Sequence, residues 1–399
     1  MNIVKALLLC LLSLTTNNGF ILRGIFRTYR NHNINKNINI NSDSFIETRQ
    51  PAAVVLQTVE EAENKYNLNW YVIGEAKRMK NNVLNRITVW NRDYVFWKNN
   101  NDYYAMDDDC SHKGASLSRG KLVNNNVMCP YHGYEFNTNG VLCKVPGLNF
   151  TNTPCQNQNT YNIVEKNGWI YMNTVSNVLY SPQKISIFEE DEARNSSLSR
   201  IFINMPFKAY GRVLTENSLD VMHIGFVHTF GNKQSPSPTK ELPPYLVGDY
   251  PYHYKTEYDY TSGKDSIAKK VFGFKQLKIE NEFALPHTTI ARVKFGELFS
   301  TIVTFASPIN VTHSTLFVKT YRNFWNSKEC DPFSKLYNWI GDRVTTEMMI
   351  ATVLQDKGII ENIKLEHSDG KFNMKFDKLQ NVYKTLYKKL VHNITATKV

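Results

Sequence analysis

Two short segments of this sequence each carry one cysteine and one histidine, at a spacing suited to a metal centre. Cys110 and His112 form the first pair, Cys129 and His132 form the second, and sixteen residues lie between the pairs. A zinc ion could be held by such a set, but zinc fingers usually present two cysteines together and then two histidines. Two mixed pairs favour a [2Fe–2S] cluster, because two cysteines can hold one iron while two histidines hold the other.

The sequences around these pairs, CSHKGASLSRG and CPYHGYEF, resemble the cluster-binding loops of Rieske-type oxygenases. Gly114 and Gly133 would let the backbone turn tightly there, so that amides can donate hydrogen bonds toward the cluster. High-potential respiratory Rieske proteins add a second cysteine to each loop, and these two cysteines form a disulfide. Ala115 and Tyr131 stand at the corresponding positions here, so the resemblance implies the lower-potential oxygenase or ferredoxin type.

A second candidate metal site lies in residues 214–228, LTENSLDVMHIGFVH. Asn217, Asp220 and His223 recur at every third residue, so on a helix they would share one face. His228 follows five residues later, and both imidazoles can reach one metal only if the helix bends or ends between them. Two histidines and one carboxylate, with open positions, form the facial triad of non-haem Fe(II) oxygenases. The alternative is a pair of helix histidines buried in a core.

The stretch NSLDVMH followed by VH resembles the mononuclear-iron motif of Rieske oxygenases. Gly225 lies between the two histidines and would allow the helix to bend. Residues 345–364 have a helical apolar pattern, and VLQDKGIIE within them resembles the late helix that supplies the carboxylate in that family. The resemblance makes Asp356 the candidate third ligand and Glu361 its rival.

The resemblance implies a Rieske non-haem iron oxygenase of the aromatic-ring-hydroxylating dioxygenase α-subunit type. Electrons from a separate ferredoxin or reductase would pass through the [2Fe–2S] cluster to a mononuclear Fe(II). With O₂ as co-substrate, this mono- or dioxygenase would oxygenate a hydrophobic, cyclic small molecule. The family also implies a head-to-tail homotrimer, in which one subunit's cluster lies beside the next subunit's iron. Asp220 would bridge the two centres by accepting hydrogen bonds from ligand imidazoles on both sides, and Asn217 is the other candidate catalytic residue.

A protein of a different class would use only part of these features. A non-catalytic Rieske electron-transfer or redox-sensing protein of a plastid complex needs the cluster loops, but it does not need His223, His228 and Asp356 together. No G-x-G-x-x-G or Walker motif is present. The sequence therefore carries no recognised signature for a nicotinamide or flavin cofactor.

The length of 399 residues allows two domains with hydrophobic cores. We expect an α+β protein, with a small antiparallel-β Rieske domain followed by a helix-grip-like catalytic domain of antiparallel sheet and helices. The expected parts are a disordered leader (1–50), the Rieske domain (51–178), the catalytic domain (179–375) and a basic, solvated C-terminal helix or tail (376–399). Runs of β-branched and aromatic residues predict strands at 69–73, 86–90, 94–97, 103–106, 140–142, 161–164 and 169–172, and within 245–325.

The net charge of +11 is concentrated at the two ends of the chain. Residues 1–50 hold six basic and two acidic side chains, and residues 371–399 hold seven basic and one acidic. The middle is therefore close to neutral. Basic ends on a neutral body do not indicate a nucleic-acid groove, so we expect no nucleic-acid partner.

The N-terminus predicts a targeting leader. Lys5 precedes an apolar run at 6–14, as in a secretory signal peptide, and this run is too short to span a membrane. The basic, Asn-rich stretch at 20–49 then resembles the bipartite leaders of algal plastid proteins. We expect a plastid protein, with secretion or the endomembrane system as the alternative, and no transmembrane helix in the mature chain. Plastid pheophorbide-oxygenase-like proteins, which the sequence also resembles, carry a C-terminal anchor and a cysteine pair that this sequence does not show after Asp356.

Overall fold

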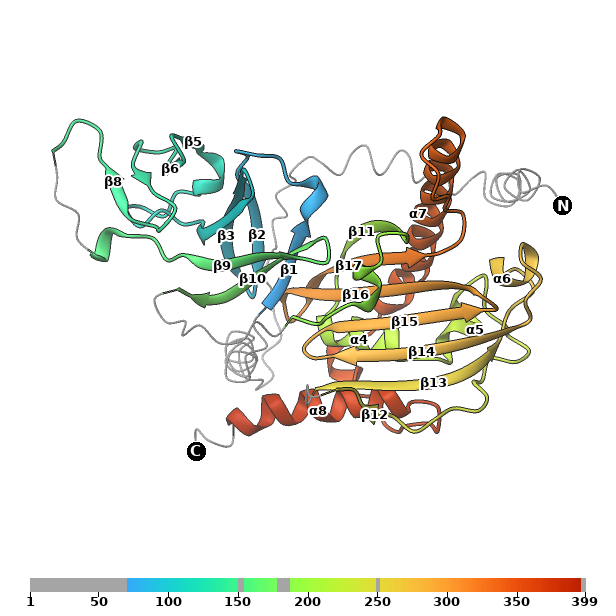
Figure 1. The fold of residues 1–399 in the computed structure, drawn as a ribbon. Coiled ribbons are helices and arrows are strands. Elements are labelled where there is room, and N and C mark those ends of the chain that lie inside the picture. The colour runs from blue at the N-terminus through green and yellow to red at the C-terminus, as the bar shows by residue number, and fades with distance from the viewer. Residues whose placement is uncertain (1–69, 150–153, 178–186, 249–251, 396–399) are drawn as a thin grey trace.

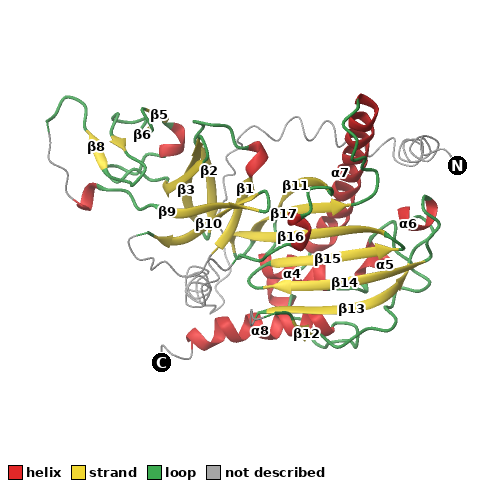
Figure 2. Cartoon of the chain, viewed as in Figure 1, coloured by secondary structure: helices red, strands yellow, loops and turns green. Residues whose placement is uncertain are grey.

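The computed structural model describes residues 70–149, 154–177, 187–248 and 252–395 (Figure 1). The predicted leader at 1–50 lies outside the described residues. The described chain is α+β, as predicted: small antiparallel sheets come first, and a larger antiparallel sheet with helices follows (Figure 2). Within these described ranges, no helix is both long enough and apolar enough to cross a membrane.

The described residues of the first part (70–149 and 154–177) form three small sheets, with strand orders β1-β10-β9, β2-β3-β4 and β5-β6-β7-β8. The predicted strands coincide with β1 to β4, β9 and β10, whereas the one predicted at 140–142 begins only at Leu142. Asparagines serve the tight turns: Asn91, Asn100 and Asn167 have positive φ, which asparagine tolerates better than most residues. The strands are β1 (Trp70–Glu75), β2 (Asn85–Val89), β3 (Arg92–Asn99), β4 (Asp102–Asp107), β5 (Lys121–Val123), β6 (Asn126–Met128), β7 (Glu135–Phe136), β8 (Leu142–Lys144), β9 (Tyr161–Lys166) and β10 (Trp169–Ser176).

The two cysteine–histidine loops stand on a small hydrophobic core of their own. Trp97 on β3 and Met106 on β4 are fully buried there, in the same cluster as Val127, Cys110 and Cys129. Each large apolar side chain contributes roughly 1.5–3 kcal/mol when it is fully buried. The packing of this core therefore fixes where the two sulfur atoms lie.

The second part is built on a seven-stranded antiparallel sheet of order β11-β17-β16-β15-β14-β13-β12. Leu277 and Ile279 on β14 pack in one cluster with Val221, close to helix α5, so this face of the sheet is the helix side. Side chains alternate along a strand, so the neighbouring Glu280 points to the opposite face. The strands are β11 (Ser199–Phe207), β12 (Tyr245–Leu246), β13 (His253–Thr261), β14 (Gln276–Ala284), β15 (Thr288–Phe295), β16 (Leu298–Asn310) and β17 (His313–Arg322).

The helices lie mainly against this sheet (Figure 1). They are α4 (Gly211–Leu219), α5 (His223–Val227), α6 (Ile267–Lys270), α7 (Pro332–Ile360) and α8 (Lys378–Thr395), with short 3₁₀ turns η1 (Ala76–Arg78), η2 (Leu117–Arg119), η3 (Pro154–Gln156), η4 (Asp191–Arg194) and η5 (Leu365–His367). The helix predicted at 345–364 is α7, which begins thirteen residues earlier than predicted. Asp331 caps it, because the side chain accepts hydrogen bonds from the amides of Phe333 and Ser334, and Pro332 follows at the first helical position.

The prediction of a solvated C-terminal tail is wrong for residues 378–389. Leu379, Tyr383 and Tyr387 recur every fourth residue on α8, and all three are buried in the main core. The Tyr387 hydroxyl lies 2.8 Å from that of Tyr210. The lysines lie at other positions of the helix, so a basic composition concealed one apolar helix face.

The small sheets and the large sheet pack directly against each other. The Ser307 hydroxyl on β16 donates a 2.5 Å hydrogen bond to the carbonyl of Val72 on β1. Tyr71 meets Phe305 edge to face, with ring centroids 6.5 Å apart. Figure 1 shows the cluster loops at the far end of the first part, away from this junction.

Candidate functional site

The two cysteine–histidine loops have the same backbone design. The amide of Gly114 donates to the carbonyl of Cys110 (2.8 Å), and the amide of Gly133 donates to that of Cys129 (3.1 Å). The Cys110 amide in turn donates to the Ala115 carbonyl, and the Cys129 amide donates to the carbonyl of Tyr134, which is also five residues later. Both glycines have positive φ, near 70°, which is the turn expected from the sequence.

These loops bring all four predicted cluster ligands together. The thiols of Cys110 and Cys129 are buried and within hydrogen-bonding reach of each other. The imidazole rings of His112 and His132 are exposed, with centroids 4.7 Å apart. Burial and the neighbouring Cys129 raise the pKa of Cys110, while the backbone amide of His112 opposes the rise. Two buried sulfurs below two exposed imidazoles match the donor set of a [2Fe–2S] cluster with two histidine ligands.

The second site begins where one helix stops and another starts. Helix α4 ends at Leu219, and the Asp220 carboxylate accepts from the amides of Met222 (2.8 Å) and His223 (3.3 Å) at the start of α5. His228 follows the last residue of α5 in an extended conformation. The helix therefore ends between the two histidines, as the spacing required.

Gly225 has a different role from the one predicted. It lies inside α5, not at a bend. A Cβ at this position would lie 2.6 Å from the Cβ of Pro236, so the glycine allows a close approach of two chain segments. Asn217, Asp220 and His223 also do not share one continuous helix, because residues 220–222 are not helical.

His223, His228 and Asp356 converge on one point, with ligand atoms within 4.8 Å of one another. The Nε2 atoms of the two histidines are 3.2 Å apart, and each lies 3.5 Å from Oδ1 of Asp356. Metal bonds of ~2.1 Å would place neighbouring ligand atoms roughly 3.0–3.4 Å apart. Glu361, the rival candidate, instead accepts a hydrogen bond from the Lys208 amide (2.7 Å).

A cation fits this group of atoms. The Nδ1 of His223 lies 2.6 Å from the backbone carbonyl of Asp220, which can only accept, so the proton sits on Nδ1 and Nε2 offers a lone pair. Oδ1 of Asp356 is buried and has no hydrogen-bond partner among the described residues. An oxygen and a nitrogen that both carry lone pairs repel each other at this distance, and a metal ion removes that repulsion.

Burial lowers the pKa of both histidines and the Asp356 carboxylate raises it, but the balance differs between the two. Burial lowers the pKa of His223, but the carboxylates of Asp356 and Asp220 outweigh it, so the pKa of His223 is raised. At His228 the effect of burial exceeds that of Asp356, and its pKa is lowered. A neutral imidazole is the form that binds a metal.

The two predicted catalytic residues lie beside this centre. Asp220 orients His223 through its backbone carbonyl, and not through its carboxylate as predicted. The carboxylate instead begins α5. Asn217 lies on the last turn of α4, and its carbonyl accepts from the Asp220 amide at 3.2 Å.

Sequence reasoning missed one residue of the site. Gln355 precedes Asp356 on α7, and its Oε1 lies 3.2 Å from Nδ1 of His228 and 3.3 Å from the amide nitrogen of Thr229. These contacts join parts of the chain that are 126 and 127 residues apart. Its position next to the candidate ligand was the one signal available in the sequence.

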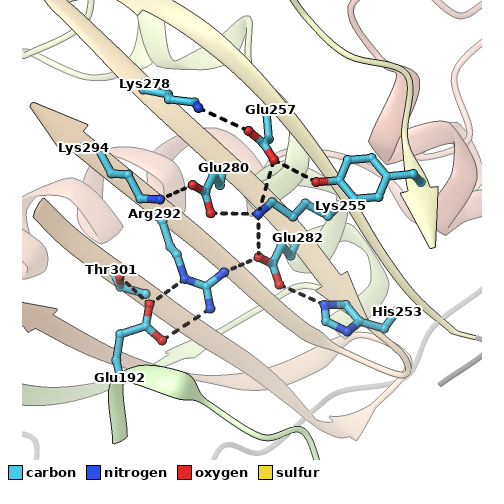
Figure 3. Close-up of polar contacts among 11 residues, drawn as sticks. Glu192, His253, Lys255, Glu257, Lys278, Glu280, Glu282, Arg292, Lys294 and Thr301 are labelled. Atoms are coloured by element: carbon cyan, nitrogen blue, oxygen red, sulfur yellow. Dashed lines mark hydrogen bonds and ion pairs between the residues drawn. The ribbon is translucent and has the colours of Figure 1, made fainter. Parts of the chain in front are cut away.

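A cavity of about 990 Å³ lies on the other face of the large sheet, and none of the three converging residues lines it. Figure 3 shows a ladder of paired charges on its floor. Arg292 contacts Glu192 (2.5 Å) and Glu282, and Glu282 also pairs with His253 (2.8 Å). Lys255 lies 2.8 Å from Glu280. The ladder lies in this cavity and apart from His223, His228 and Asp356, so it adds no ligand to the metal site.

Comparison with known proteins identifies the domain in the first part of the chain. Residues 69–155, which include all four predicted cluster ligands, match the family model of the Rieske [2Fe-2S] domain. Chlorophyllide a oxygenase, chloroplastic, of Chlamydomonas reinhardtii is 29% identical over 185 residues, which are 44% of this chain and 26% of that protein. Methylxanthine N1-demethylase NdmA of Pseudomonas putida is 31% identical over 147 residues, which are 36% of this chain and 40% of that protein.

The fold is shared over a longer stretch than the sequence similarity. The crystal structure of dicamba monooxygenase bound to dicamba matches with a TM-score of 0.67 at 18% identity, over 82% of this chain and 98% of that chain. The predicted fold class, a Rieske β domain followed by a catalytic domain, is confirmed by this match. By contrast, the sequence alignments span less than half the length of the two curated relatives.

The chain contains a Rieske [2Fe–2S] domain, and its relatives include proteins named as oxygenases and demethylases. The resemblance stated from the two loop sequences is thereby confirmed. The match to this domain implies a [2Fe–2S] cluster in the first part of the chain.

Proposed function

We propose that this chain is the oxygenase component of a Rieske non-haem iron system. The cluster would be held by Cys110, His112, Cys129 and His132, and the mononuclear Fe(II) by His223, His228 and Asp356. One observation carries the proposal: a Rieske domain is followed, in the same chain, by two histidines and a carboxylate whose ligand atoms lie within 4.8 Å. When bound, the iron supplies the activation of O₂.

The protein's own residues would prepare the site for this chemistry. The Asp220 carbonyl holds the His223 ring so that Nε2 faces Asp356. We propose a hydrophobic, cyclic small molecule as the substrate and hydroxylation or a related oxygenation as the reaction. The relatives named as chlorophyllide a oxygenase and methylxanthine N1-demethylase support a cyclic substrate.

Electron delivery would need a separate donor and a second subunit. The exposed rings of His112 and His132 make the cluster accessible to a ferredoxin or reductase and to a neighbouring copy of this chain. We propose a head-to-tail homotrimer, in which the Asp220 backbone carbonyl accepts from the His223 imidazole and the Asp220 carboxylate accepts from a cluster histidine of the next subunit. The amide hydrogen bonds that Asp220 accepts at the start of α5 would hold it in place.

We also propose a plastid location. The relative from Chlamydomonas reinhardtii is named as chloroplastic, and the composition of residues 1–50 suits a signal peptide followed by a transit segment. A fusion of residues 1–50 to a fluorescent protein, expressed in an alga with such plastids, tests this. Fluorescence confined to the endomembrane system would contradict the plastid assignment.

The iron content tests the proposed function directly. An oxygenase holds two irons in the cluster and a third in the mononuclear site, whereas a non-catalytic Rieske carrier or redox sensor holds two. We expect three irons per chain in the anaerobically loaded protein, and two after His228→Ala with an unchanged reduced-cluster electron resonance signal. We further expect ¹⁸O from ¹⁸O₂ in the product of at least one cyclic candidate substrate. Two irons in both proteins would favour the carrier.

A further inference from the structure

The side-chain amide of Gln355 has one orientation that satisfies its contacts. The backbone amide of Thr229 is a donor under all conditions, and it lies 3.3 Å from the Gln355 atom assigned as Oε1. An NH₂ group at that position would set donor against donor, so the atom must be the oxygen. The Nε2 atom of Gln355 then faces the Thr229 hydroxyl at 3.5 Å.

This orientation determines the tautomer of His228. The same Oε1 lies 3.2 Å from Nδ1 of His228, and an amide oxygen can only accept. Nδ1 must therefore carry the proton, which leaves the lone pair on Nε2. That lone pair faces Nε2 of His223 and Oδ1 of Asp356, at 3.2 and 3.5 Å.

The two histidines of the site are thus oriented by different kinds of group. His223 donates to a backbone carbonyl, which no substitution can remove. His228 donates to a side chain, and that side chain comes from helix α7, next to Asp356. One turn of α7 therefore presents one ligand directly and orients a second.

We infer that Gln355 is a positioning residue for the mononuclear iron: it selects the metal-binding tautomer of His228 and holds the His228 loop against the helix that carries Asp356. The inference rests on the proposed iron site. Outer partners of metal-bound histidines typically account for about 10–100-fold in metal affinity. Gln355 is half-buried and bonds to the Thr229 amide as well, so its loss releases both the ring and the backbone beside it.

Three substitutions on α7 or at its end test this role in the cluster-loaded full chain. Gln355→Leu keeps the size of the side chain but removes the acceptor. Gln355→Glu keeps an acceptor oxygen at the same place. Asn362→Leu is the matched control, because it also removes a carboxamide, but one that bonds to the Gly358 carbonyl (2.8 Å) and not to a histidine.

The readout is the Fe²⁺ dissociation constant, from anaerobic competition with a chelator, together with the visible absorption of Co²⁺ in the same site. We expect about 10–100-fold weaker Fe²⁺ binding and an altered Co²⁺ spectrum for Gln355→Leu. Affinity within about threefold of the native value is expected for Gln355→Glu, because the acceptor is retained, and for Asn362→Leu. The cluster signal should be equal in all four proteins.

The outcomes separate this inference from the proposed function. If the native chain binds no third iron, the proposed oxygenase site is wrong. If the native chain binds it and Gln355→Leu binds it equally well, the positioning role is wrong and the proposed function stands. Equal weakening by Gln355→Leu and Gln355→Glu, or by Gln355→Leu and Asn362→Leu, would also overturn the positioning role.

Discussion

Lys319 is a fully buried lysine at the junction of the two parts of the chain. Its ammonium group lies 2.8 Å from a carboxylate oxygen of Glu190 and 2.8 Å from the Asn167 carbonyl. It also lies over the indole ring of Trp169, 4.0 Å from the centroid. Burial lowers the pKa of Lys319 to about 8, although Glu190 acts in the opposite direction.

A lowered pKa in the folded state makes stability depend on pH with a definite sign. An unfolded lysine titrates near ~10.4, so between about pH 8 and ~10.4 the unfolded state binds more protons than the folded state. Stability must then rise with pH across that window. Integrating the difference in bound protons from pH 7 to pH 9.5 gives a gain of about 2 kcal/mol in the free energy of unfolding.

The assay is urea unfolding at pH 7.0, 8.0, 9.0 and 9.5, on the native chain and on a variant with Lys319→Met and Glu190→Gln. The double change avoids leaving a buried carboxylate without its partner. The glutamine can still accept the 2.7 Å hydrogen bond that the Tyr321 hydroxyl donates to Glu190. Other groups titrate in both proteins, so the quantity of interest is the difference between the two curves.

We expect the native chain to gain about 2 kcal/mol relative to the variant between pH 7 and 9.5. A difference that stays constant within ~0.5 kcal/mol would refute the reasoning. It would mean that the Glu190 carboxylate and the Trp169 ring compensate fully for the removal of the ammonium from water. A difference that falls with pH would mean that the pKa of Lys319 is raised.

Two further predictions concern the bridging carboxylate and the charge ladder. Asp220→Asn should keep both metals in the chain, because an amide oxygen can still accept from the His223 amide. It should abolish turnover, because the amide cannot carry the bridging charge. Substantial remaining activity, measured with iron content as the control, would contradict the bridging role. Arg292→Met should destabilise the chain by about 3–5 kcal/mol in urea unfolding, since it removes the ion-pair partner of the buried Glu192 carboxylate and one of the partners of Glu282. Lys278→Met at the exposed end of the ladder should cost less than ~1 kcal/mol. Equal losses of stability in the last two variants would show that burial does not determine how much each ion pair of the ladder contributes.

The sequence was most informative where a chemical function requires particular residue types at a short spacing. The cluster loops needed only residues 110–115 and 129–134, and the structure builds both with local hydrogen bonds. The start of α7 was also present in the sequence, because Asp331 and Pro332 form a recognisable cap, but the apolar pattern alone pointed to residue 345. Local signals of this kind can be read without knowledge of the fold.

Contacts between distant segments could not be predicted in this way. Gln355 meets His228 across 127 residues, and no spacing rule connects them. The helix is interrupted before His223 because the Asp220 carboxylate accepts hydrogen bonds from two backbone amides there. A helical repeat in the sequence does not predict these hydrogen bonds. The burial of Tyr383 and Tyr387 likewise follows from the presence of the sheet beneath α8.

Helix α7 connects the edge of the large sheet with the candidate metal site. Three turns into the helix, Asp342 bonds to Ser199 and to Arg322 (2.8 Å) at one corner of the large sheet. Asp356 follows fourteen residues later, which is ~21 Å along the axis and nearly four whole turns. The carboxylates of Asp342 and Asp356 therefore project from a similar side of α7. A small rotation of α7 about its axis at the sheet corner would move the Asp356 carboxylate relative to the imidazoles of His223 and His228. Substitutions at Arg322 are therefore expected to shift Asp356 in the proposed iron site, although Arg322 itself contacts Asp342 and not the site.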